Sequence, residues 1–338
     1  MPKPEEEKFR FPEFGELLKF GSVYFFVALI ELQAKLSATP AWFNGTLDGN
    51  HRLLLAFQYT NNEQSRLLQF YIPEAFVRLL GLSVINAYIL QRWLFVFLAL
   101  WCFHAYLRKW FDVRLAFAGV MSLAAVMPLS YFNDLQESSP LLLLTFLLGL
   151  WAIREHRTGW YMLILAVGAI NNETMLFVPS VYFFYGFNGM KWKRLGRLAL
   201  ATLATSLPAF LLVGAIRYLN RDRPHLGPVW QLPGNIEGLL GQLKSSPLDY
   251  WGASYFYIFF IFNALWVFAF LKYARKPLFL RRAALMIPLF VLGHFLTGRI
   301  HEVRQMVPLS FLILPMAFFY LFPAPQEQRQ VNLEESGC

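Results

Sequence analysis

The sequence predicts an all-α protein, a polytopic bundle of transmembrane helices that forms a single integral membrane domain over residues 1–338. Of the 338 residues, 57% are hydrophobic, 18% are aromatic and only 15% are charged. The mean hydropathy of +0.43 also exceeds what soluble domains show. Apolar stretches long enough to cross about 30 Å of hydrocarbon recur along the chain, so little sequence is left for a soluble domain.

We expect about ten spans, because a helical crossing needs roughly 17 to 25 residues. The first, near 20–38, follows a mixed-charge segment and has no small-residue cleavage site, which favours a retained helix over a signal peptide. In this interpretation 1–19 is a cytoplasmic segment, 20–322 is the transmembrane region and 323–338 is a cytoplasmic polar tail. The remaining spans are expected near 85–107, 115–132, 139–153, 159–170, 174–188, 198–216, 254–271, 283–298 and 306–322.

Two of these stretches, Gly159 to Ile170 and Met175 to Gly186, are short for a crossing, since about twelve residues of helix reach only about 18 Å. Basic turns flank the pair on both sides, so they form a hairpin. Its polar apex contains Asn172 and Glu173. A carboxylate at membrane depth is tolerated against protein or a water-filled cavity, and the apex is therefore expected to line a cavity.

The orientation follows from the basic residues, because Lys and Arg beside a span resist translocation. Most of the 30 Lys and Arg residues lie in the N-terminal segment and in the turns at 108–114, 154–157, 191–197 and 272–282. We therefore expect a multi-pass protein of the bacterial inner membrane with both termini in the cytoplasm. Anionic membrane lipids beside these turns account for the net charge of +9. No nucleic-acid partner is expected.

Two long loops, roughly 39–84 and 217–252, then face the opposite side. Within the first, apolar residues recur at helical spacing over 67–80, which predicts an interfacial helix. Gln91 and Arg92 lie inside an otherwise apolar span, and Arg92 is expected to extend its side chain to the outer interface.

Asp48, in the first long loop, is the candidate catalytic residue. A carboxylate at the mouth of the cavity could take a proton from an acceptor hydroxyl while a new bond forms. The alternative is a structural turn, because Asn-Gly and Asp-Gly pairs favour turns whatever the activity.

Arg299 and Arg304 flank Glu302 at the start of the last span. Arg is the side chain best shaped to hold a phosphate through two parallel hydrogen bonds. These two residues are therefore the candidates for binding a substrate phosphate, and Glu302 is expected to line the cavity. The alternative is an ion pair with Glu302 or a contact with lipid headgroups.

Asp134, Glu137 and Glu173 fall on the same predicted side and are also expected to line the cavity. Three carboxylates could hold a divalent cation, since hard cations take oxygen ligands. Solvated charges in turns are the alternative, because the spacing matches no metal motif. We assign no cofactor and no metal-ligand residues from the sequence.

The order of these features resembles bacterial polytopic proteins of the GT-C glycosyltransferase superfamily. The resemblance rests on the Asp-Gly turn at Asp48, on Tyr-Phe-Asn-Asp at 131–134, on Asn-Glu-Thr before an apolar helix at 172–179, and on Glu-Val-Arg-Gln-Met-Val-Pro at 302–308. Asn172 stands where the family's apex motif usually has a basic residue.

The resemblance implies a membrane glycosyltransferase that takes its sugar from a polyprenyl-phosphate donor on the extracytoplasmic side, with Asp48 as base. The expected partners are membrane lipids and the lipid-linked sugar. Two alternatives remain open. One is a non-catalytic subunit that packs against other membrane proteins in a larger assembly, and the other is a transporter of a lipid-linked solute.

Overall fold

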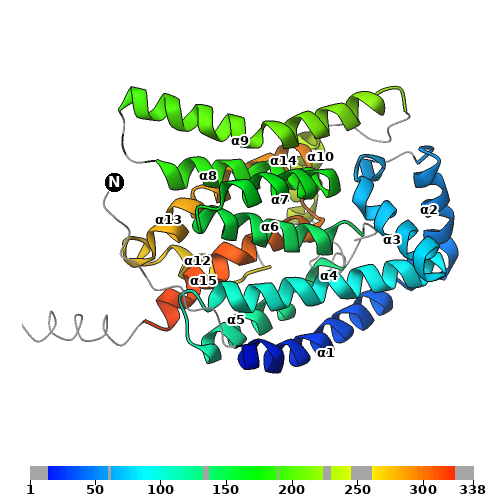
Figure 1. Cartoon of the computed structure of the whole chain (residues 1–338), viewed down its shortest axis with the longest axis horizontal. Helices are drawn as coiled ribbons and strands as arrows, with labels where there is room; N and C mark the ends of the chain where they lie inside the picture. Colours follow the sequence, from blue (N-terminus) through cyan, green and yellow to red (C-terminus); the bar gives the residue numbers. More distant parts are fainter. Residues whose placement is uncertain are drawn as a thin grey trace, which may run out of the picture.

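The computed structural model describes residues 14–59, 62–131, 137–187, 189, 191–223, 230–244 and 261–323. The regular elements among these residues are helices, without a strand. The axes of most of the long helices are roughly aligned, with α9 along one edge of the bundle and α1 along the other (Figure 1). The prediction of an all-α bundle is confirmed.

Residues 254–260 of the expected span 254–271 lie outside the described residues. Helices occupy most of the other predicted spans, and short 3-10 turns separate several of them. Their bounds are α1 Phe14–Ala38, α2 Leu47–Leu55, α3 Leu67–Leu80, α4 Val84–Leu107, α5 Val113–Val126, α6 Ser139–Arg154, α7 Thr158–Asn171, α8 Val178–Gly186, α9 Trp192–Leu219, α10 Leu232–Lys244, α12 Leu265–Phe270, α13 Leu278–Ala284, α14 Met286–Thr297 and α15 Ser310–Leu321.

Local signals in the sequence explain where several helices begin and end. The hydroxyl of Ser83 accepts a hydrogen bond from the backbone N–H of Asn86 at 3.3 Å, and Asp112 does the same for Leu115 at 2.8 Å. Each thereby satisfies an N–H group left open at the start of α4 or α5. Gly81 ends α3 with a φ of 68°, a left-handed conformation that glycine adopts without steric cost.

Six helical segments of the described chain are long and apolar enough to cross a membrane, as a multi-pass protein requires: Phe14–Ala38, Val84–Leu107, Val113–Ser130, Trp192–Leu219, Leu278–Thr297 and Val303–Leu321. α6 and α7 are apolar but shorter, with 16 and 14 residues. α8 has only nine residues, so α7 and α8 form the short hairpin that the sequence predicts.

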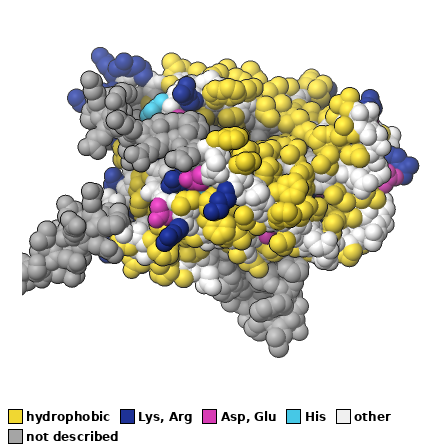
Figure 2. Space-filling model, turned by 60° about the horizontal axis from the view of Figure 1, so that its bottom comes forward, with side chains coloured by type: hydrophobic (Ala, Val, Ile, Leu, Met, Phe, Trp, Pro, Cys, Tyr) yellow, Lys and Arg dark blue, Asp and Glu magenta, His cyan; other side chains and the backbone are white. Residues whose placement is uncertain are grey.

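The core of the bundle lies around α6, which packs between α4 and α7 and buries most of its side chains. α9 is the opposite case, because only 17% of its apolar window is buried inside the protein. Broad apolar areas also cover the face drawn in Figure 2, where most of the Lys and Arg lie toward one end. Such a surface is what contact with lipid would require.

The two ends of the bundle differ in chemistry. α7 and α9 end at Asn171 and Leu219 on the same side as α2 and α3, at the right of Figure 1. The basic turns that follow α4, α6 and α8 lie at the other end. We call the first the polar end and the second the basic end.

Candidate functional site

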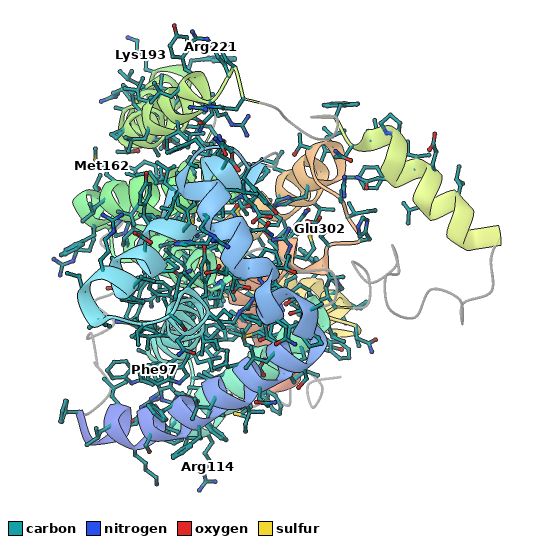
Figure 3. The ribbon with its side chains drawn as sticks, turned by 90° about the vertical axis from the view of Figure 1, so that its right-hand side faces the viewer. Phe97, Arg114, Met162, Lys193, Arg221 and Glu302 are labelled. Atoms are coloured by element: carbon teal, nitrogen blue, oxygen red, sulfur yellow. The ribbon has the colours of Figure 1, made fainter. Side chains whose placement is uncertain are left out.

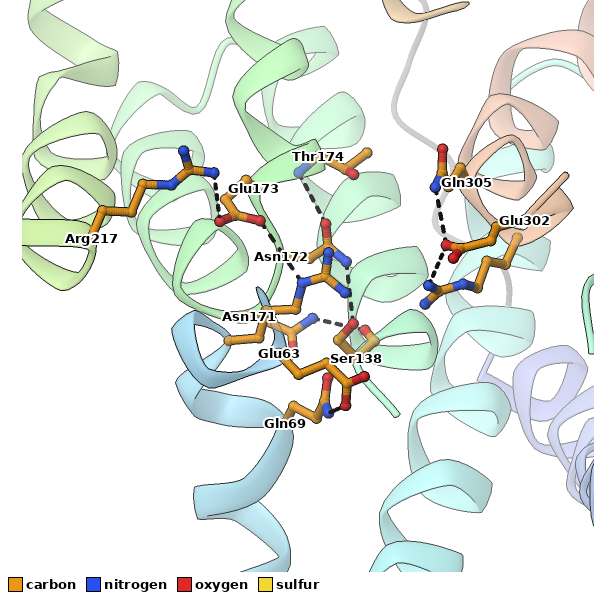
Figure 4. A network of polar contacts seen from close by, with 12 residues as sticks. Glu63, Gln69, Ser138, Asn171, Asn172, Glu173, Thr174, Arg217, Glu302 and Gln305 are labelled. Atoms are coloured by element: carbon orange, nitrogen blue, oxygen red, sulfur yellow. Dashed lines mark hydrogen bonds and ion pairs between the residues drawn. The ribbon is translucent and has the colours of Figure 1, made fainter. Parts of the chain in front are cut away.

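The polar apex between α7 and α8 packs onto the segment that begins α6. Asn171 donates a hydrogen bond of 2.8 Å from Nδ2 to the backbone oxygen of Ser138, and Asn172 donates one of 3.2 Å to the Ser138 hydroxyl. Oδ1 of Asn172 accepts from the backbone N–H of Thr174 at 3.0 Å and so holds the turn after α7. The predicted apex therefore meets the start of α6 in space (Figure 4).

Glu173 lies at this apex between two arginines that come from distant parts of the chain. Nη2 of Arg217, in the last turn of α9, donates to Oε1 of Glu173 at 3.0 Å. On the other side, Nε of Arg66, just before α3, lies 3.8 Å from Oε2. The carboxylate is 22% exposed, so it lines the edge of the polar end.

Glu302 and Arg304 face the same region from the start of the last span. Nη2 of Arg304 donates to Oε2 of Glu302 at 2.6 Å, and Nε2 of Gln305 donates to the same oxygen at 3.2 Å. Burial raises the pKa of the Glu302 carboxyl, but Arg304 and these hydrogen bonds outweigh it, so the pKa lies below its ordinary value. Glu302 is therefore ionised at neutral pH.

Arg66 links the two groups electrostatically. Burial lowers the pKa of its guanidinium. The negative charges of Glu173, Glu63 and Glu302 oppose that shift, whereas the positive charge of Arg304 adds to it. Charges act on one another in this way only over short distances, so the arginine trio (Arg66, Arg217 and Arg304) and its carboxylates form one cluster. Figure 4 shows the cluster between the apex and the segment that carries Glu302.

Arg92 and Glu137 form a second, fully buried pair beside this cluster. Nε of Arg92 lies 2.9 Å from Oε2 of Glu137, with side-chain exposures of 3% and 1%. The expectation that Arg92 extends to the interface is wrong, because the carboxylate from the start of α6 holds it inside the bundle. Glu137 is likewise not a solvated turn charge.

A small cavity of about 20 Å³ joins the two groups, with Arg92, Ser130, Tyr131 and Arg304 among its lining residues. Its size suits about one water molecule. A phosphate group would require side chains around it to move apart. The cavity nevertheless shows that Arg92 and Arg304 reach the same interior space.

Buried polar atoms that lack a hydrogen-bond partner among the described residues gather at this end of the bundle. Such an atom costs about 1–3 kcal/mol when buried, so a concentration of them favours a polar ligand. They include Arg66 Nε and Nη1, Gln69 Oε1, Gln91 Oε1, Glu137 Oε1 and Asn171 Oδ1.

Two of the sequence-predicted residues lie apart from these contacts. Asp48 is 42% exposed on α2 and forms an ion pair of 3.0 Å with Arg52, one turn further along the same helix. Arg299 is exposed, and its backbone oxygen accepts a hydrogen bond of 2.9 Å from the N–H of Glu302. Asp134 lies outside the described residues. The structure therefore brings together Glu137, Asn172, Glu173, Glu302 and Arg304 but not Asp48 or the Arg299 side chain.

No family model, curated protein or solved structure matches the chain.

Sequence reasoning missed Arg66 and Arg217, both of which pair with Glu173. Neither lies in a motif, and Arg217 begins the predicted loop 217–252, which contains further arginines at 221 and 223. The sequence contained one indication of these arginines. More carboxylates than basic residues were predicted at the polar end, so further cations were needed there.

The carboxylates of this region face guanidinium groups. Within the described ranges, no group of three His, Cys, Asp or Glu side chains could hold a metal ion. The predicted three-carboxylate cation site includes Asp134, so it stays a prediction. What the described arrangement can do is hold an anion: several guanidinium groups converge, and two N–H groups of Arg66 lack a hydrogen-bond partner there.

Proposed function

We propose that the protein is a membrane glycosyltransferase that takes a sugar from a polyprenyl-phosphate donor on the extracytoplasmic side of the membrane. The observation that carries the proposal is the arginine trio at the polar end, gathered from three distant segments around Glu173 and Glu302. A lipid-linked sugar has one anionic group, its phosphate, at membrane depth. The trio offers guanidinium groups at the edge of an apolar bundle, where such a phosphate would arrive.

The chemistry follows from the charge that develops during sugar transfer. As the glycosidic bond breaks, negative charge grows on the leaving phosphate, so cations already in place lower the barrier directly. Arg66 and Arg304 are the best placed, because both lie inside the cluster, with side-chain exposures of 15% and 8%. Arg217 is 60% exposed and is suited to guiding the donor inward.

Asp48 keeps its proposed role as the base that accepts the proton of the acceptor hydroxyl. α2 lies at the polar end, beside α3, so an acceptor that arrives from that side meets Asp48 on an exposed surface (Figure 1). To act on the donor, α2 would have to carry Asp48 toward Arg66, and the ion pair with Arg52 would have to open. Exposed ion pairs contribute only about 0–1 kcal/mol, so opening it costs little.

The topology is part of the same proposal. It includes ten crossings, a bacterial inner membrane, cytoplasmic termini, a GT-C arrangement of the helices and a polar end on the extracytoplasmic side. The basic turns after α4, α6 and α8, at the opposite end, support this orientation.

The test is transfer activity in proteoliposomes supplied with polyprenyl-phosphate-linked sugars and a panel of hydroxyl acceptors. Asp48→Asn should abolish transfer, and Arg304→Gln should weaken donor binding by roughly tenfold or more, as loss of a charged hydrogen bond does. Asp222→Asn is the matched control, because Asp222 is 84% exposed and also pairs with a neighbouring arginine. Undiminished turnover in Asp48→Asn would remove Asp48 from the mechanism.

One observation favours a second candidate, a non-catalytic subunit that binds a lipid phosphate. Glu137, Glu173 and Glu302 each form an ion pair with an arginine, so these carboxylates are already engaged within the protein. In that case the reconstituted protein binds the donor without consuming it. It also co-purifies with a fixed partner from its native membrane.

A further inference from the structure

One buried histidine at the polar end takes no part in the contacts described above. His294 lies in the last turn of α14, and only 8% of it is exposed. Its Nε2 atom has no hydrogen-bond partner among the described residues. A buried ring nitrogen in this state is disfavoured, because it has lost its contact with water and gained no other. The atom therefore marks a place where a polar group of a ligand fits.

The imidazole faces the arginine cluster of the polar end. It interacts electrostatically with Arg66, Arg304 and Glu302, and such interactions are strong only over short distances. Figure 3 faces this end of the bundle and shows Glu302 near its centre, close to α14. The histidine thus belongs to the region in which we place the phosphate of the lipid donor.

Two aromatic rings hold the imidazole in place. The ring of Phe290, one turn earlier in α14, lies 4.5 Å from that of His294 between centroids, at an angle of 60°. The ring of Phe177 lies 5.4 Å away, and this residue ends the 3-10 turn that begins at Glu173. Packing on two sides restricts rotation of the imidazole, so Nε2 keeps one direction.

The backbone that carries His294 is held by α10. Nδ2 of Asn235 donates to the backbone oxygens of Phe295 and Gly298, both at 2.8 Å. Oδ1 of the same side chain accepts from the backbone N–H of Ile300 at 3.2 Å. These contacts join the end of α14 to the segment that leads into the last span. The histidine is therefore positioned before any ligand binds, as an effective binding group must be.

Gln305 lies beside the imidazole but does not satisfy it. Nε2 of Gln305 donates to Glu302 at 3.2 Å, which leaves Oε1 as the amide atom that could accept from the ring. The two side chains interact, yet neither Gln305 Oε1 nor His294 Nε2 has a hydrogen-bond partner in the described part of the chain. The ring nitrogen is therefore available to a ligand.

We propose that Nε2 of His294 donates a hydrogen bond to the phosphate of the polyprenyl-phosphate donor, beside Arg66 and Arg304. An imidazole with its proton on Nε2 is a donor, as are Nε and Nη1 of Arg66, which also lack a hydrogen-bond partner over the described ranges. The non-bridging oxygens of a phosphate accept such bonds, and an ionised acceptor makes them stronger. The inference rests on the proposed function, because it adds a contact to the same donor.

Binding of a polyprenyl phosphate to the full-length protein in detergent, compared with the polyprenol of equal chain length by native mass spectrometry, tests the proposal. The wild type should prefer the phosphate by at least about tenfold. His294→Phe keeps an aromatic ring in place and should lower that preference by about tenfold, with unchanged affinity for the polyprenol. The control is His156→Phe, which removes an exposed imidazole stacked on Tyr185 at the basic end. It should keep the preference within about twofold.

Two amide variants locate the contact on the ring. The amide nitrogen of glutamine can reach the position of Nε2, whereas that of asparagine reaches only the position of Nδ1. His294→Gln should therefore bind the phosphate within about threefold of the wild type, and His294→Asn as weakly as His294→Phe.

The outcomes separate this inference from the proposed function. Unchanged phosphate binding in His294→Phe would overturn the inference and leave the proposed function standing. Equal losses of phosphate and polyprenol binding would also overturn it, because they would show a packing role. A wild type that does not prefer the phosphate would contradict the proposed function and this inference together.

Discussion

Nε of Arg92 donates a hydrogen bond of 2.9 Å to Oε2 of Glu137, and neither side chain is more than 3% exposed. The pair fastens the middle of α4 to the residue that precedes α6, the central helix of the bundle. Both charges are removed from water, and each stabilises the other. The pair therefore fixes the position of α4 relative to the start of α6 at the polar end.

Removing one member of this pair should destabilise the protein strongly. Glu137→Gln or Arg92→Gln breaks a buried ion pair, which typically costs about 3–5 kcal/mol. Thermal unfolding in detergent should show this as a large fall in Tm. Arg52→Gln is the control, since Arg52 and Asp48 are 75% and 42% exposed and such pairs contribute about 0–1 kcal/mol. Equal effects of the three changes would contradict the assignment.

Stability should fall in acid because of Glu302. The pKa of its carboxyl lies below the ordinary value of 4.5. Burial raises this pKa, but Arg304, Gln305 and Arg66 together lower it by more. A carboxyl whose pKa is depressed in the folded state adds stability above pH 4.5, and that contribution disappears as the pH falls through the folded-state pKa. Unfolding measured from pH 7 to pH 3 should show the loss, and Glu302→Gln should reduce the slope. An unchanged slope in the variant would exclude Glu302 as its source.

Stability should rise in mild alkali because of Lys276. The amine is buried and donates to the backbone oxygens of Phe268 and Met316, at 3.1 and 2.5 Å. Burial lowers its pKa from 10.5 to about 8. The unfolded chain therefore binds more protons between these two values, and the free energy of unfolding increases as the pH rises from about 8 to 10.5. Lys276→Met should flatten this part of a pH series of chemical unfolding, whereas the exposed Lys272→Met should not.

Alanine substitutions at two glycines should change the stability of the protein in opposite directions. A methyl group at Gly293 of α14 would lie 2.3 Å from Cζ of Phe177, so Gly293→Ala forces a ring to move and should cost about 1–3 kcal/mol. Gly196 in α9 has open space around it. There the better helix propensity of alanine should stabilise the protein by about 0.5–1 kcal/mol. Tm values of the two variants measure the difference, and a fall in both would refute the packing argument.

Hydropathy predicted the bounds of several helices. The expected spans 85–107, 139–153 and 159–170 correspond to Val84–Leu107, Ser139–Arg154 and Thr158–Asn171, because each ends where charged or polar residues interrupt an apolar run. The number of crossings is harder to predict. α6, α7 and α8 are shorter than the bilayer requires, and only their packing against neighbours decides how deep they lie.

The site was predicted in part. Polar breaks in apolar sequence marked Glu137, Glu173, Glu302 and Arg304, since charges in such places need partners. The identity of those partners depends on tertiary contacts. Arg66, just before α3, and Arg217, in α9, lie 107 and 44 residues from Glu173 in sequence, and neither has a local signal. Asp48, by contrast, is paired with a residue four positions away.

The least and the most buried of the candidate spans tolerate different amino-acid substitutions. Of the apolar window in α9, 17% is buried inside the protein, against 83% in Val303–Leu321. Lipid accepts any apolar side chain, whereas a packed neighbour accepts only a fitting shape. Across related chains α9 should drift freely among Leu, Ile, Val and Phe, while the last span should change slowly and in step with the helices that surround it.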